Sequence, residues 1–306
     1  MVPLGQLDLL HAAAGLLVGL LVGLTGVGGG SLMTPLLVLV FGVSPQTAVG
    51  TDLLYAAVTK INGSAVHGWR DTVDWRIVRR LAYGSIPTAL LTLVTLSYVG
   101  KVGASSEHVI LLSLARLLAI TSLTVLFRSR LITLSQELHP LDPPFKVLAG
   151  TTALGAVIGV AVTVSSVGAG AIGMTVLLML YPRLPVVRIV GSDISHAVPL
   201  TLIAGTGHWL IGDVDSVLLV NLLVGSIPGV IIGSLLSTRA PDKILQPLLA
   251  LVLALSAWQL GLKGLAEVRP HTASTASLVR ADAATSLGNV RYQLVHRPAA
   301  TAYLGR

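Results

Sequence analysis

Five ionisable side chains interrupt stretches of sequence that are otherwise strongly apolar: Asp52, Lys60, Arg116, Asp193 and His196. Such groups are costly inside an apolar segment, so they usually face a cavity, a partner or an ion pathway. We treat Asp52, Asp193 and His196 as candidates for coupling to a proton or cation. His196 follows Asp193 by one helical turn on the same face, where it could share a proton. Lys60 and Arg116 are candidate counter-charges for an anion, although Arg116 could instead pair with one of the aspartates.

Two glycine-rich clusters, 26–31 and 165–170, could supply the rest of an anion site. Each precedes an apolar run that is short for crossing a membrane. The start of a helix leaves backbone N–H groups without intrahelical acceptors, and these favour an anion; tight helix packing is the structural alternative. The candidate substrate-binding residues are Gly26, Gly28, Gly29, Gly30, Ser31, Thr51, Lys60, Asn62, Arg116, Ser165, Ser166, Gly168, Gly170 and Ser192.

The tripeptides Gly50-Thr51-Asp52 and Gly191-Ser192-Asp193 predict a helix break followed by an N-cap and an acidic first turn. Together with the two glycine clusters, such breaks would bring four helix N-termini toward the middle of the molecule. Their partial positive charges would favour an anion over a cation. The two aspartates would then act either as caps or as coupling carboxylates.

The elements that must position these groups are membrane helices. Of 306 residues, 53% are hydrophobic and only 11% are charged, against roughly 25% charged residues in a soluble domain. The pattern predicts an all-α membrane protein in which the runs after the glycine clusters form broken or re-entrant helices. The expected apolar segments are 9–25, 31–43, 46–67, 78–99, 108–127, 146–163, 171–181, 187–211, 216–237 and 243–264.

Basic residues gather in short connections such as 68–80 and 128–146, which places those loops in the cytoplasm of a multi-pass plasma (inner) membrane protein. The net charge of +7 therefore reflects orientation in the membrane, and nucleic acid is not an expected partner. The expected parts are an N-terminal end (1–8), a first transmembrane repeat (9–127), a cytoplasmic linker (128–145), a second repeat (146–264) and a disordered tail or cloning remnant (265–306).

The two halves of the chain repeat, because short blocks recur in the same order at a nearly constant offset. The matched blocks are Gly26-Val-Gly-Gly-Gly-Ser31 with Ser166-Val-Gly-Ala-Gly-Ala171, Val49-Gly-Thr-Asp52 with Val190-Gly-Ser-Asp193, and Gly84-Ser-Ile-Pro87 with Gly225-Ser-Ile-Pro228. The loop at 68–80 is basic whereas its counterpart is acidic, so we expect inverted repeats of about five segments each. A pseudo-two-fold axis in the membrane plane would relate them, as is typical of secondary transporters.

At these blocks the chain resembles the TauE/SafE family of membrane transporters, often called sulfite exporters. The resemblance covers about residues 9–264 and includes Ala48-Val-Gly-Thr-Asp52 and Val73-Asp-Trp75. It implies a small sulfur-containing anion, such as sulfite or sulfoacetate, as the substrate class. The second half departs from the glycine run of the first, because Ala169 and Ala171 stand where Gly29 and Ser31 stand.

These features predict a secondary transporter for a small sulfur-containing or organic anion, with ion coupling left open. An anion channel shares every one of the features. A less favoured alternative is an intramembrane enzyme that uses Ser192, Ser195, Asp193 and His196; we do not expect an enzyme. The chain has no cysteine, no metal-ligand spacing and no nucleotide-binding motif, so no cofactor or metal is expected. The expected partners are the small anion and the lipid bilayer, and a homo-oligomer is compatible with the sequence.

Overall fold

A computed structural model describes residues 8–25, 30–69, 71–99, 105–138, 144–168, 170–236 and 245–266. All regular structure in these ranges is helical. The elements are α1 (Leu9–Thr25), α2 (Gly30–Leu39), α3 (Pro45–Trp69), α4 (Trp75–Val99), α5 (Ser105–Leu126), α6 (Arg128–Leu138), α7 (Pro144–Ser165), α8 (Ala171–Leu180), α9 (Val186–Ile211) and α10 (Ser216–Leu236), followed by a final helix at Leu245–Ala266. The all-α fold predicted from the sequence is confirmed.

Six of the described helices are long and apolar enough to cross a membrane. They correspond to α4, α5, α7, α9, α10 and the final helix, and each lies where an apolar run predicted it. The two helices that follow the glycine clusters, α2 and α8, have only 10 residues each. At 1.5 Å per residue they are about 15 Å long, roughly half of a bilayer core, as expected for broken or re-entrant segments.

The helix breaks predicted at Gly50 and Gly191 are wrong, because α3 and α9 run without interruption through both positions. The reason at Gly50 is close packing. A Cβ atom there would lie 2.5 Å from the backbone oxygen of Asp213, so no larger residue fits. The four converging N-termini expected from the sequence are therefore reduced to the starts of α2 and α8.

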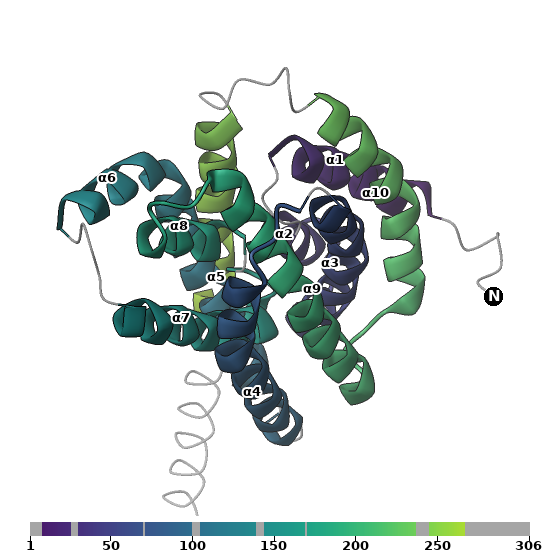
Figure 1. Ribbon diagram of the computed structural model, residues 1–306. Helices are drawn as coiled ribbons and strands as arrows, with labels where there is room; N and C mark the ends of the chain where they lie inside the picture. The colour runs from purple at the N-terminus through teal and green to yellow at the C-terminus, as the bar shows by residue number, and fades with distance from the viewer. Residues whose placement is uncertain are drawn as a thin grey trace, which may run out of the picture.

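Helices of the first half pack mainly against helices of the second half. The most extensive contacts join α1 to α10, α4 to α7, and α3 to α9. Figure 1 shows α3 and α9 in the middle of the bundle, with α1 and α10 together on one side and α4 and α7 on the other. The polar residues at the centre therefore come from a crossing of α3 with α9.

The contacts recur in matched pairs. A Cβ atom on Gly15 would lie 2.2 Å from the Leu222 oxygen, and one on Gly155 would lie 2.2 Å from the Leu81 oxygen. Gly155 and Leu81 stand at the positions that the repeat matches to Gly15 and Leu222. Such reciprocal contacts are what a two-fold relation between the halves would produce. They do not fix the direction of the axis in the membrane, so the inversion of the repeats stays a prediction.

Asp74 and Asp215, which are 141 residues apart like the matched blocks at Val49–Asp52 and Val190–Asp193, begin two of the long helices. Asp74 Oδ1 accepts a hydrogen bond from the Arg76 N–H at 2.9 Å, and Asp215 Oδ1 accepts one from the Val217 N–H at 2.9 Å. Both therefore serve as N-caps, of α4 and α10 respectively. These caps fix the residues at which the loops end and α4 and α10 begin beside the central helices α3 and α9.

The observed bounds refine the expected parts of the chain. The linker 128–145 contains α6, and the final helix reaches Ala266, slightly beyond the expected end of the second repeat. The first glycine cluster at Gly26, Gly28 and Gly29, the side chain of Asn62 and the tail from 267 to 306 lie outside the described residues.

Candidate functional site

Buried polar side chains gather where α3 crosses α9. Asp52 is 0% exposed, Asp193 is 5% exposed and His196 is 1% exposed. Lys60, two turns after Asp52 on α3, is half-buried. We call Asp52, Lys60, Asp193 and His196 the core cluster. The three predicted coupling residues and Lys60, one of the two candidate counter-charges, thus come together from two helices.

Asp52 is fixed by a neighbour on α2. The Thr34 hydroxyl donates a hydrogen bond to Asp52 Oδ2, and Thr34 is itself 0% exposed. The Ser166 hydroxyl lies close to the same carboxylate, but neither Ser166 Oγ nor Asp52 Oδ1 makes a hydrogen bond of ordinary geometry. Ser166 belongs to the second glycine cluster and has a left-handed backbone with a φ of 59°. The Asp52 carboxylate therefore lies between α2 and the turn that precedes α8.

Asp193 lies against the first turn of α8. A Cβ atom on Gly173 would be 3.0 Å from Asp193 Oδ1, and that oxygen has no hydrogen-bond partner. Gly170, at the start of α8, provides no side-chain cap for this end of the helix. A carboxylate at a helix N-terminus is stabilised by the partial positive charge there. The position where the sequence predicted a bound anion thus holds one of the protein's own carboxylates.

Lys60 is the only cation in the core cluster, and it interacts electrostatically with both Asp193 and Asp52. His196 also lies in the field of Lys60. Opposite charges interact more strongly in an apolar interior than in water, because the surroundings screen them less. The cluster therefore combines one positive charge, two acidic groups and one imidazole, of which only the half-buried Lys60 is more than 5% exposed.

Two further hydrogen bonds lie at or next to the core cluster, and their residues stand at equivalent positions of the two repeats. The Tyr55 hydroxyl pairs with the Ser226 hydroxyl, and His196 Nε2 pairs with the Ser85 hydroxyl at 2.7 Å. Tyr55 and His196 stand at equivalent positions of the two repeats, as do Ser85 and Ser226. His196 Nδ1 has no hydrogen-bond partner. Sequence reasoning missed Thr34, Tyr55, Ser85 and Ser226, although both serines lie within the matched Gly-Ser-Ile-Pro blocks.

Thr51 and Ser192 serve the loops rather than the core cluster. The Thr51 hydroxyl accepts a hydrogen bond from the Asp215 N–H at 3.2 Å, and the Ser192 hydroxyl accepts one from the Asp74 N–H at 2.8 Å. Each therefore ties a central helix to the residue that caps α10 or α4. Their predicted contact with a substrate gains no support from this placement.

The remaining candidates differ in their surroundings. Ser31 is 4% exposed on α2, and the Ser165 hydroxyl bonds to the Ala161 oxygen and to the Val167 N–H at the end of α7. Gly168, with a φ of 115°, forms the turn into α8. Arg116, in contrast, lies on an exposed face of α5 and is not part of the core cluster.

The enzyme alternative finds little support in this geometry. Ser192 is engaged with Asp74, and the Ser195 hydroxyl accepts a hydrogen bond from Ser64 at 3.1 Å. The imidazole of His196 instead pairs with Ser85, and no carboxylate of the described residues orients its Nδ1 atom. A nucleophile and base would need that third group. Within the described residues, no group of three or more His, Asp or Glu side chains could hold a metal ion.

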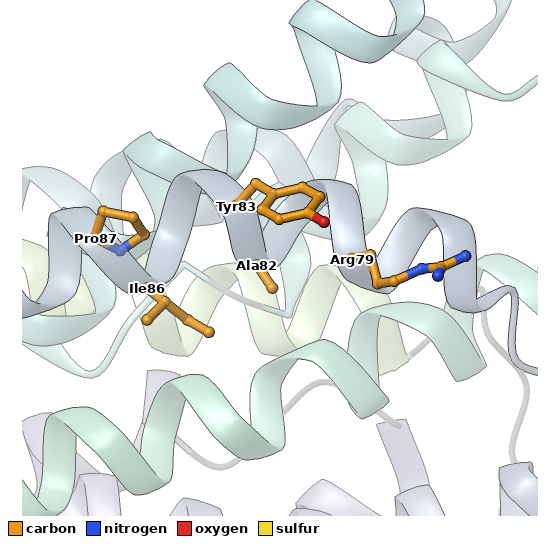
Figure 2. A pocket seen from close by; sticks show the side chains of 5 residues that line it. All are labelled: Arg79, Ala82, Tyr83, Ile86 and Pro87. Carbon is orange, nitrogen blue, oxygen red and sulfur yellow. The ribbon is translucent and has the colours of Figure 1, made fainter.

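A groove of about 290 Å³ lies elsewhere, on α4 (Figure 2). It is lined by Arg79, Ala82, Tyr83, Ile86 and Pro87. None of these residues belongs to the core cluster, and Tyr83 is 72% exposed. The groove is therefore a feature of the outer surface of α4 and not the candidate site.

Long apolar helices around a buried polar cluster define a polytopic α-helical membrane protein. Residues 11–260 match the family described as sulfite exporter TauE/SafE, and the chain belongs to that family. By this membership it is a multi-pass membrane transporter.

Several curated proteins are similar to this chain. Probable membrane transporter protein YjnA of Bacillus subtilis (strain 168) is 39% identical over 250 residues, which cover 80% of this chain and 96% of that protein. Probable membrane transporter protein YdhB of the same organism is 26% identical over 78% of this chain and 94% of its own length. A probable membrane transporter protein of Xylella fastidiosa (strain 9a5c) is 29% identical over 74% of this chain and 83% of its own length. No solved structure matches the chain.

Proposed function

We propose that this protein is a secondary transporter that moves a small sulfur-containing anion, such as sulfite or sulfoacetate, across the plasma membrane. The core cluster is the proposed substrate site. Lys60 supplies the fixed positive charge, and the start of α8 supplies N–H groups with partial positive charge. The family description, sulfite exporter, supports the substrate class.

The observation that carries this proposal is the burial of unpartnered polar atoms beside a cation. Asp52 Oδ1, Ser166 Oγ, Asp193 Oδ1 and His196 Nδ1 are all buried and find no hydrogen-bond partner among the residues that the structure describes. Unsatisfied buried polar atoms cost about 1–3 kcal/mol each. Three of the four belong to residues that interact electrostatically with Lys60, so a polar ligand beside Lys60 would complete their bonding.

Substrate access requires a conformational change, because Asp52, Asp193 and His196 at the centre are at most 5% exposed. Opening to one side at a time would give alternating access, whereas a continuous pore would give a channel. The close packing of α1 on α10 and of α4 on α7 favours movement of these pairs as rigid units about the α3–α9 crossing.

The test is counterflow with purified protein in liposomes loaded with one of four unlabelled anions: sulfite, thiosulfate, sulfoacetate or acetate. A trace of the same anion, labelled, is added outside. A transporter accumulates the labelled anion inside transiently above its external concentration, whereas a channel only equilibrates it. Lys60→Met keeps the aliphatic stem and removes the charge, so transport should fall at least about tenfold, equivalent to about 1.4 kcal/mol. Unchanged transport in this variant would remove Lys60 from the site.

Two matched variants control for the loss of a positive charge. Lys263 is half-buried on the final helix and Arg116 is exposed on α5, and neither belongs to the core cluster. Lys263→Met and Arg116→Met should both transport at the wild-type rate. A loss of transport in Arg116→Met alone would transfer the role of counter-charge to Arg116. Absence of movement for all four anions would refute the proposed substrate class.

A further inference from the structure

The two halves of the core cluster are not equivalent, although their backbones pair symmetrically. The repeat matches Lys60 to Thr201, and the Thr201 hydroxyl bonds to its own helix at the Ala197 oxygen. The cluster therefore holds two carboxylates, Asp52 and Asp193, but only one lysine. With both carboxylates ionised its charge is −1, and an incoming anion would be repelled.

The two carboxylates also differ in how firmly they are held. Asp52 accepts a hydrogen bond from Thr34 on α2. Asp193 is only 5% exposed and lies against the first turn of α8. Its Oδ1 atom nevertheless finds no hydrogen-bond partner among the described residues. Asp193 therefore lies beside the start of α8 and in the field of Lys60, where an anion would be held, and no described backbone or side-chain donor bonds to its Oδ1 atom.

We propose that Asp193 is an internal substitute for the substrate anion and binds a transported proton when that anion enters. This inference rests on the proposed function. The proton comes from the aqueous phase and forms an O–H bond on the Asp193 carboxylate, which becomes a neutral carboxyl group. Lys60 and the start of α8 then interact with the substrate anion in place of Asp193. One proton enters with each anion, so the charge of the cluster stays at −1 for a monovalent anion and becomes −2, instead of −3, for a divalent anion such as thiosulfate.

The other ionisable groups of the core cluster and its surroundings favour Asp193 as the proton acceptor. On α3, Lys60 interacts with both Asp193 and Asp52, and Tyr55, which interacts with Asp52, already pairs its hydroxyl with Ser226. On α9 the neighbour is His196, and a proton there would place a second positive charge beside Lys60. The adjacent helix α8 carries no ionisable residue, and α4 contributes the Ser85 hydroxyl to His196.

The experiment measures protons moved per anion in liposomes that hold a trapped pH-sensitive dye. Thiosulfate is the probe, because it remains a dianion between mildly acidic and neutral pH and therefore carries no proton of its own. In the wild-type protein an inward thiosulfate gradient should acidify the interior, with a fixed ratio of protons to thiosulfate. Asp193→Asn cannot take the proton, so this ratio should fall at least about tenfold and thiosulfate counterflow should lose its dependence on pH. Asp193→Glu should restore proton movement.

Asp52→Asn is the matched control from the first half, and it should keep the wild-type ratio whatever its transport rate. A ratio that survives in Asp193→Asn, or that is lost in Asp52→Asn, would overturn the assignment. Infrared difference spectra give a second readout that does not need transport. Thiosulfate should produce the carbonyl band of a protonated carboxyl group in the wild-type protein and in Asp52→Asn, but not in Asp193→Asn. Thiosulfate transport without any proton movement would refute this inference alone, whereas absence of anion transport would refute the proposed function.

Discussion

The contact of α1 with α10 gives a sharp test of the fold, because backbone approaches backbone there. A Cβ atom on Gly225 would lie 1.7 Å from the Ala12 oxygen, and real Cβ contacts are essentially never below 3.0 Å. Gly225→Ala would therefore force the two helices apart until that gap is made up. The shift also opens the close contacts at Gly229 and Gly233, where a Cβ would lie 2.4 and 2.3 Å from backbone oxygens of α1.

The expected cost of Gly225→Ala follows from two opposing terms. Overpacking a well-filled interior costs about 1–3 kcal/mol, and more where backbone atoms block relief. Alanine in place of helical glycine returns about 1 kcal/mol. We expect a net loss of about 2 kcal/mol, which lowers the melting temperature by about 4–8 °C on the scale for domains of this size.

The assay is the temperature at which the detergent-solubilised protein loses its monodisperse gel-filtration peak. Gly261→Ala is the matched control, since a Cβ on Gly261 would lie 3.9 Å from the Ala115 Cβ, an ordinary contact. It should leave the melting temperature unchanged or raise it. If Gly225→Ala were as stable as the wild-type protein, the reasoning from close packing of α1 and α10 would be refuted.

Three shorter predictions concern other parts of the chain. Thr34→Val should cost about 1–3 kcal/mol of stability, because Asp52 loses its hydroxyl donor. Thr175→Val is the control and should cost less, because the Thr175 hydroxyl bonds within its own helix. Equal melting temperatures for the two variants would contradict this prediction. Deletion of residues 267–306, which lack an apolar stripe, should leave folding and transport near normal, as checked by gel filtration and counterflow. At the start of α1, a hydrogen bond from the Leu10 N–H and the adjacent imidazole of His11 hold the pKa of Asp8 below its usual 3.8. The ionised carboxylate therefore stabilises the folded protein above pH 3.8, and this stabilisation is lost as the pH falls through the lowered pKa. Asp8→Asn should flatten the acid end of a curve of stability against pH.

Hydropathy was sufficient to place every described helix except α6, which lies in the stretch expected to be a linker. Every apolar run expected from the sequence contains a helix, and the short runs after the glycine clusters became α2 and α8. The misplaced breaks at Gly50 and Gly191 have a different origin. From local sequence one can infer that glycine weakens a helix. One cannot infer that the backbone carbonyl of Asp213, far away in the sequence, occupies the space beside Gly50.

The candidate site was predicted only in part. Asp52, Lys60, Asp193 and His196 were found because ionisable groups are rare in apolar segments. Arg116 met the same criterion, yet it faces outward, because an apolar run does not reveal which face of its helix is buried. Thr34 was missed because a hydroxyl in a membrane helix commonly bonds to its own backbone, as Thr175 does with the Ala171 oxygen.

The crosswise packing of the halves has a consequence for biosynthesis. Helix α1 leaves the ribosome long before the surface that it fits, because α10 is made only from residue 216 onward. Until then the backbone-exposing face around Gly15 meets lipid or a chaperone of the insertion machinery. The first repeat made alone would lack partners for both α1 and α4, so co-expression of the two halves as separate chains should recover far more folded protein than either half expressed by itself.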